Sequence, residues 1–123
     1  STDVVNSIRS VLKAEHIATV RQQVKSLTIE EKLLQFIANF IHQTRNHKSI
    51  YLGGSPRASL AVMNASKAMA AINGRDFVTP DDIIEVISPV LRHRLILSPD
   101  KEMEGVTEDA VIKQILQTMD IPR

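Results

Sequence analysis

Apolar residues recur at helical spacing along most of this 123-residue chain, and this periodicity limits the possible fold more than any other feature. An amphipathic helix carries apolar residues three or four positions apart, so that they line one face. Three segments show the pattern clearly: Leu33, Leu34, Ile37, Phe40 and Ile41; Ile83, Ile84, Ile87, Val90 and Leu91; and Val111, Ile112, Ile115, Leu116 and Met119. The sequence therefore predicts an all-α fold, a bundle of about four to five helices.

The predicted helices cover residues 12–26, 28–44 and 56–72, with a fourth beginning at Pro80 and a last one beginning near Thr107. Pro89 falls inside the fourth helix and predicts a kink or a break there, because proline lacks a backbone N–H and clashes with the preceding turn. Residues 50–52 are expected to be extended. Residues 92–99 either end the fourth helix or form a short extended segment. We expect residues 12–123 to form one domain, after a linker or an extra helical turn over residues 1–11.

Local signals mark where two of these helices begin. Thr79 is a good N-cap and is followed by Pro80, which suits the first helical position. Thr28 and Glu31 have the spacing of a capping box, in which the two side chains satisfy each other's free backbone N–H groups. The helix over residues 56–72 is expected to be central, because its predicted inner face is small: Ala58, Ala61, Ala65, Ala68 and Ile72.

Composition excludes several classes of protein. With 15 basic and 14 acidic residues the net charge is +1, which disfavours a dedicated nucleic-acid-binding protein. The absence of cysteine excludes disulfides and thiolate zinc sites, and it fits a cytoplasmic location. No apolar run approaches the ~20 residues that a transmembrane helix needs, so no membrane span is expected.

Motifs of enzymatic chemistry are also missing from the sequence. The four glycines form neither a phosphate-cradling GxxxxGK[ST] loop nor a GxGxxG motif. The histidines are scattered without metal-ligand spacing, and Ser55 and Ser59 have no neighbouring histidine to activate them. We therefore expect no metal site and no catalytic residue in this chain.

The segment Gly53-Gly54-Ser55-Pro56-Arg57 predicts a loop, a serine N-cap and a helix that begins at Pro56. Arg57 then lies in the first turn, where the helix dipole disfavours a cation. A guanidinium beside free backbone N–H groups suits an anion, and a phosphate fits best. Alternatively, Arg57 pairs with a carboxylate on a neighbouring helix. The local sequence does not decide between these two interpretations.

A second basic cluster, Arg92-His93-Arg94, follows the fourth predicted helix. Positive charge is favourable at a helix C-terminus, so a purely structural role is sufficient. The functional alternative is a contact with an acidic partner surface or a phosphate.

Three motifs together resemble the MoxR family of AAA+ ATPases. The run Tyr51-Leu52-Gly53-Gly54-Ser55-Pro56-Arg57-Ala58-Ser59-Leu60 is similar to the sensor-2 motif of that family. The likeness continues through Gly74-Arg75-Asp76-Phe77-Val78-Thr79-Pro80-Asp81-Asp82 and through Pro89-Val90-Leu91-Arg92-His93-Arg94-Leu95. The three motifs stand in the order that the family uses. The looser likeness covers residues 12–123.

The resemblance implies that the chain is the C-terminal α-helical lid of an ATPase whose nucleotide-binding core, with its Walker A and Walker B motifs, would lie upstream. Arg57 matches the sensor-2 arginine that reaches the γ-phosphate of ATP, and Gly54, Ser55 and Pro56 match the loop that directs it. ATP with Mg²⁺ would be the cofactor of the parent enzyme. The triplet Arg92, His93 and Arg94 is a candidate contact between domains or subunits.

The resemblance also implies partners for the parent protein. Members of the family form homo-oligomeric rings, here expected to be a hexamer, and remodel client proteins in bacteria as chaperone-like machines. Many act with a partner that carries a von Willebrand factor A domain. Two other functions remain open from the residues alone: a histone-fold-like or helical nucleic-acid-binding module, and a stand-alone protein-interaction bundle.

Overall fold

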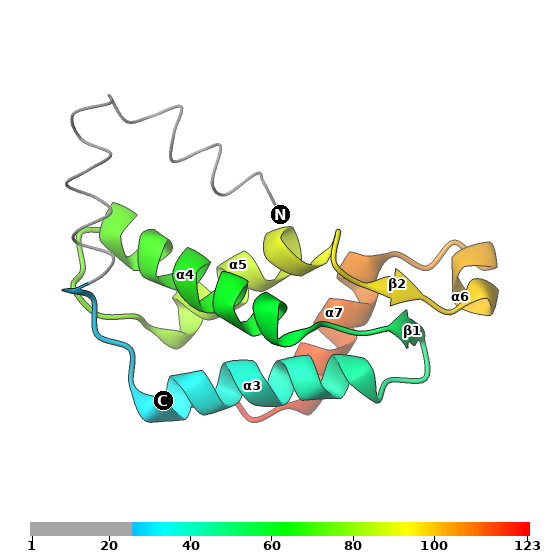
Figure 1. Cartoon of the computed structure of the whole chain (residues 1–123), viewed down its shortest axis with the longest axis horizontal. Coiled ribbons are helices and arrows are strands. Elements are labelled where there is room, and N and C mark those ends of the chain that lie inside the picture. The colour runs from blue at the N-terminus through cyan, green and yellow to red at the C-terminus, as the bar shows by residue number, and fades with distance from the viewer. Residues whose placement is uncertain (1–25) are drawn as a thin grey trace.

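Five helices and a two-stranded sheet make up residues 26–123, the part of the chain that the structure, a computed structural model, describes (Figure 1). The elements are α3 (Glu31–Arg45), β1 (Ile50–Leu52), α4 (Pro56–Ile72), α5 (Pro80–Leu91), β2 (Ile96–Leu97), α6 (Pro99–Met103) and α7 (Glu108–Thr118). The predicted helical bundle is confirmed. The expectations for residues 1–11 and for the helix over residues 12–26 fall outside the described residues, except at Ser26.

The helix α3 begins later than predicted, and the expected capping box is wrong. Its N-cap is Glu30, and no side chain caps the helix. Thr28 lies instead in a parallel bridge with Phe77. The Thr28 N–H donates to the Asp76 carbonyl at 3.1 Å, and the Val78 N–H donates to the Thr28 carbonyl at 3.0 Å. Because tertiary pairing already uses the Thr28 backbone in an extended conformation, the helix starts beyond it.

The predicted bounds of α4 are confirmed, but its predicted inner face is only partly right: Ala58 is buried and Ala61 and Ala65 pack partly against the core. The buried residues are Ala58, Val62, Ser66 and Ala70, which lie four positions apart, whereas Ile72 is exposed. The Ser66 hydroxyl donates to the Val62 carbonyl at 2.7 Å, which satisfies it inside the core. Since α4 carries small or apolar residues on most sides, the sequence pattern alone does not single out the face that is buried.

The helix α5 buries one whole face in the core. Ile83, Val86, Ile87 and Leu91 are all fully buried, and α5 packs against α4 and α7. The predicted Thr79 cap is confirmed. The predicted disruption at Pro89 is not observed as a break, because the helix continues to Leu91. Pro89 stands so near the C-terminus that the helix ends within one further turn.

The connection after α5 turns into a strand. Of the two alternatives for residues 92–99, the extended one is confirmed at Ile96 and Leu97, which pair antiparallel with β1 through Leu52 and Ile50 respectively. The short helix α6 was not predicted. The helix α7 begins near Thr107 as predicted, and Thr107 caps it: its hydroxyl accepts from the Ala110 N–H at 3.1 Å.

The arrangement brings the end of α3 beside the start of α4. In Figure 1, α3 lies along one side of the molecule, α4 and α5 lie along the other, and β1, β2 and α6 form one end. The strand β1 connects α3 to α4 and contacts α3 on its way. Among the described residues no helix has the length and apolar content needed to cross a bilayer.

Candidate functional site

The loop before α4 presents Arg57 in the way that the sequence predicts. Ser55 is the N-cap residue, with extended backbone angles, and Pro56 is the first helical residue. The Ser55 hydroxyl makes no capping hydrogen bond, although its carbonyl accepts from the Ala58 N–H at 2.9 Å. The first turn of α4 contains no acidic residue. The positive end of the helix dipole is therefore not neutralised by its own helix.

The Arg57 side chain is exposed and forms no hydrogen bond or ion pair with any residue of the described range 26–123. The alternative in which a neighbouring helix supplies a carboxylate partner is therefore not observed within that range. A guanidinium carries five N–H donors in a planar fork that matches the geometry of a phosphate. Arg57 thus leaves its full donor set available to an anion outside this part of the chain.

Two residues at the end of α3 hold the loop, and the sequence analysis missed both. The buried Gly54 N–H donates to Thr44 Oγ1 at 2.9 Å, and the Gly54 carbonyl accepts from Arg45 Nε at 2.7 Å. Thr44 is fully buried. One signal was present in the sequence: Thr44 lies three positions after Ile41 and four after Phe40, so it stands on the apolar stripe of α3.

Gly53 passes very close to the backbone of α3. A Cβ at this position would lie 2.7 Å from the Arg45 Cα, the Arg45 nitrogen and the Thr44 carbonyl carbon. These are backbone atoms, so any larger residue would push the loop away from the helix. Glycine is needed here for space, and it lets the loop lie directly on the C-terminal turn of α3.

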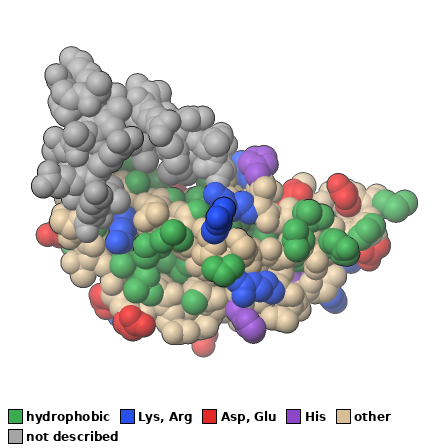
Figure 2. All heavy atoms as spheres, in the orientation of Figure 1, with side chains coloured by type: hydrophobic (Ala, Val, Ile, Leu, Met, Phe, Trp, Pro, Cys, Tyr) green, Lys and Arg blue, Asp and Glu red, His purple; other side chains and the backbone are tan. Residues whose placement is uncertain are grey.

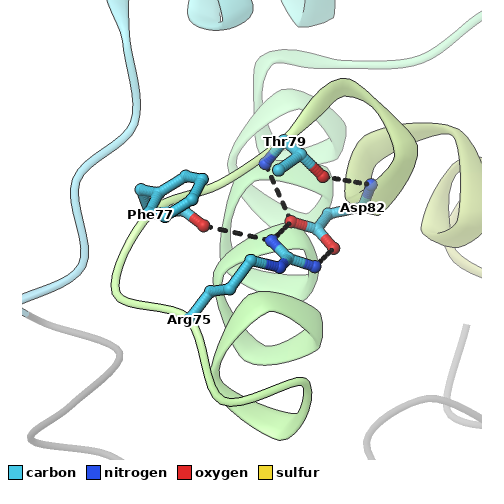
Figure 3. A network of polar contacts seen from close by, with 4 residues as sticks. All are labelled: Arg75, Phe77, Thr79 and Asp82. Carbon is cyan, nitrogen blue, oxygen red and sulfur yellow. Dashed lines mark hydrogen bonds and ion pairs between the residues drawn. The ribbon is translucent and has the colours of Figure 1, made fainter.

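A network of polar contacts fixes the connection between α4 and α5 (Figure 3). Arg75 forms a bidentate pair with the buried Asp82, with both N···O distances 2.6 Å, and it also donates to the Phe77 carbonyl. Asp82 accepts from the Thr79 N–H at 2.8 Å, which completes a capping box. Arg75, unlike Arg57, is therefore held by an ion pair and hydrogen bonds within its own domain.

The same network sets the ionisation of Asp82. Burial by itself would raise the pKa of this carboxyl, but hydrogen bonds from Arg75 and Thr79 and the charge of Arg75 outweigh it, so the pKa lies below its ordinary value. The pKa of Arg75 is raised, first by its hydrogen bond to Asp82. Asp82 is thus the anchor of this connection.

The basic triplet after α5 is divided between two environments. Arg92 pairs with Asp109 in the first turn of α7, with Nε and Oδ1 3.2 Å apart, and so joins α5 to α7. His93 and Arg94 are exposed.

Figure 2 shows Lys and Arg side chains beside hydrophobic ones on one face of the molecule. The exposed hydrophobic residues of the described range include Tyr51, Leu52, Leu60 and Ile96.

Comparison with known proteins identifies the domain. Residues 42–115, which include the whole loop and the triplet, match the AAA lid domain family. This chain belongs to the AAA lid domain family. The lid domain is 30% identical to the chaperone MoxR1 of Mycobacterium tuberculosis over 124 residues, which cover 94% of the chain and 33% of that protein.

Two further similarities agree with this assignment. The lid domain is 30% identical over 118 residues to the uncharacterised protein YeaC of Bacillus subtilis, covering 96% of the chain and 37% of YeaC. It also superimposes on the crystal structure of a candidate ATPase from Cytophaga hutchinsonii with a TM-score of 0.79 and 34% identity, covering 84% of this chain and 34% of the other. The chain thus spans about a third of the length of each. The resemblance to MoxR-type lids is confirmed.

Proposed function

We propose that this lid domain completes the nucleotide site of a MoxR-type AAA+ ATPase and that Arg57 is its sensor-2 arginine. The observation that carries the proposal is the exposed guanidinium of Arg57, which has no partner among residues 26–123 and stands on a loop held at Gly54. Neither alternative function is favoured by a specific observation. The near-neutral charge of the chain disfavours the nucleic-acid-binding alternative.

The residues present fit the terminal phosphate of ATP. Neither the guanidinium nor the backbone N–H of Arg57 has an acceptor among residues 26–123, so two kinds of donor are available at the start of α4. Bound ATP would supply the transferable phosphoryl group and its negative charge. We assign the phosphate-cradling loop and the Mg²⁺ ligands to an AAA+ core that would precede this chain.

Arg57 would act in two ways. Its charge would stabilise the negative charge that develops on a transferred phosphoryl group, as arginines do in other nucleotide hydrolases. It would also couple the lid to the state of the nucleotide, because loss of the terminal phosphate would remove the partner of Arg57 and release the lid.

In the same proposal the parent ATPase works in the cytoplasm as a chaperone-like ring, with a von Willebrand factor A domain protein as a partner.

Replacing Arg57 tests the proposal directly. We expect Arg57→Ala in the full-length ATPase to lower ATP turnover by about 10²-fold, because one charge-stabilising donor is lost. The unfolding midpoint should not change, since Arg57 makes no hydrogen bond or ion pair within residues 26–123 that the substitution would remove. Lys113→Ala is the matched control, because Lys113 is an exposed cation on α7. Turnover at the wild-type rate in Arg57→Ala would contradict the proposal.

A further inference from the structure

One peptide unit of the loop, at Gly54, is held on both of its polar groups by neighbouring residues of α3. Thr44 Oγ1 accepts from the Gly54 N–H at 2.9 Å, and Arg45 Nε donates to the Gly54 carbonyl at 2.7 Å. The Thr44 hydroxyl donates its own proton to the Ile41 carbonyl at 2.6 Å. Because a hydroxyl has a single proton, this bond leaves the lone pairs of the oxygen to accept the hydrogen bond from the Gly54 N–H.

The loop between this contact and Arg57 has little freedom. Gly54 is buried, and a Cβ on it would already touch Ala58 and Ile41 at 3.3 Å. Pro56 restricts its own backbone and that of Ser55. Only these two residues separate the held Gly54 from Arg57. The position of the α3 C-terminus therefore determines where the start of α4, and with it Arg57, is presented.

We propose that Thr44 and Arg45 are positioning residues for Arg57: they hold the Gly54 peptide so that the guanidinium is presented to the nucleotide in one geometry. This inference rests on the proposed function, since it assumes that Arg57 meets the terminal phosphate. Charge stabilisation is effective when the donor is already in place before reaction, and small displacements of a catalytic group cause large losses of rate. Neither residue needs to touch the nucleotide for this role.

Thr44→Val in the full-length ATPase removes the hydroxyl while keeping the shape of the side chain. We expect it to lower the kcat for ATP about fivefold, because one hydrogen bond that orders the loop is lost. Thr44→Ser keeps the hydroxyl and should stay within about twofold of the wild type. The matched control is Thr118→Val, which removes the same kind of bond, from Thr118 Oγ1 to the Ile115 carbonyl at 2.7 Å, at the end of α7.

A double-mutant cycle separates positioning from general structural damage. If Thr44 acts through Arg57, Thr44→Val should cause no further loss of turnover in the Arg57→Ala background. A role in stability alone would lower turnover by the same factor in both backgrounds. If Thr44→Val does not fold, Arg45→Lys serves in its place, because Arg45 is exposed and lysine keeps the charge but loses the Nε donor. Arg45→Lys should likewise cause no further loss of turnover in the Arg57→Ala background.

The outcomes distinguish this inference from the proposed function. Suppose that Arg57→Ala lowers turnover, and that Thr44→Val or Arg45→Lys lowers it by the same factor with and without Arg57→Ala. This result overturns the positioning role and leaves the sensor-2 proposal intact. Wild-type turnover in Arg57→Ala overturns both. Hydrogen exchange at the Gly54 amide can be measured by mass spectrometry on the full-length protein. Faster exchange in Thr44→Val than in the wild type supports the hydrogen bond between Thr44 and Gly54, and unchanged exchange overturns it.

Discussion

Two arginines near opposite ends of α4 have contrasting environments. Arg75, after the C-terminus, forms a bidentate pair with the buried Asp82 and lies 5.9 Å from the centroid of the Phe77 ring. Arg57, in the first turn, is exposed and has no partner within the described residues. A satisfied arginine holds the fold together, whereas an exposed one without a partner at a helix start is available to a ligand. This contrast is why we assign Arg75 to stability and Arg57 to function.

Asp82→Asn should destabilise the domain by about 2 kcal/mol near neutral pH, because it removes a buried, hydrogen-bonded charge from Arg75. The folded pKa of Asp82 lies below its ordinary value of 3.8, so its contribution is present above pH 3.8 and is lost as the pH falls through the lower folded pKa. The stability difference between wild type and variant should therefore narrow below pH 3.8. Urea unfolding across this range measures it.

Asp81→Asn is the control for that prediction, because Asp81 is exposed in the same helical turn. It should change the free energy of unfolding by less than about 0.5 kcal/mol. The difference in the free energy of unfolding between wild type and Asp82→Asn could instead stay constant down to strongly acidic pH. That result would show that the Arg75–Asp82 pair does not determine how the stability of the domain changes in acid.

At the scale of elements, similar start signals had different outcomes. Thr79 caps α5 as its sequence predicts, with the Asp82 N–H 3.4 Å from the Thr79 hydroxyl and the Thr79 N–H 2.8 Å from the Asp82 carboxylate. Thr28, with Glu31 at capping-box spacing, caps nothing and pairs with Phe77 instead. Capping is local, but it forms only when no long-range partner takes the same backbone groups.

This difference predicts unequal mutational effects at the two helix starts. Thr79→Ala should destabilise the domain by about 1 kcal/mol, because the α5 cap loses its acceptor. Glu31→Ala should change stability by less than about 0.5 kcal/mol, because no cap hydrogen bond depends on its carboxylate. Thermal unfolding of both variants measures the difference. Equal losses would mean that Glu31 does cap α3 in solution.

At the scale of the whole molecule, one core joins α3, α4, α5 and α7, and the polar surface outside it carries the candidate contacts with other domains. Arg92 belongs to the internal framework through its pair with Asp109, whereas His93 and Arg94 are exposed. Exposed charges on a rigid framework act mainly on partner choice and orientation. We therefore propose that His93 and Arg94, more than Arg92, face another domain or subunit in the assembled ATPase.

Arg94→Glu in the full-length protein should weaken its assembly into the proposed hexameric ring, because reversal of an interface charge places like charges together. We expect the midpoint of assembly with ATP to move to about tenfold higher protein concentration, as measured by sedimentation. Lys113→Glu, the same change at an exposed position on α7, should leave the midpoint unchanged. Assembly of Arg94→Glu at the wild-type concentration would rule out an interface role for Arg94.

The sequence by itself determined the helical class, the bounds of α4, the starts of α5 and α7, and the placement of Arg57 in a first helical turn. These features depend on local signals such as apolar spacing, caps and proline, which act over a few residues. Only the tertiary structure decided the buried face of α4, the pairing of Thr28 and the contact of Thr44 and Arg45 with Gly54. In each case a side chain or a backbone group had several possible partners, and the packing of distant segments selected one of them.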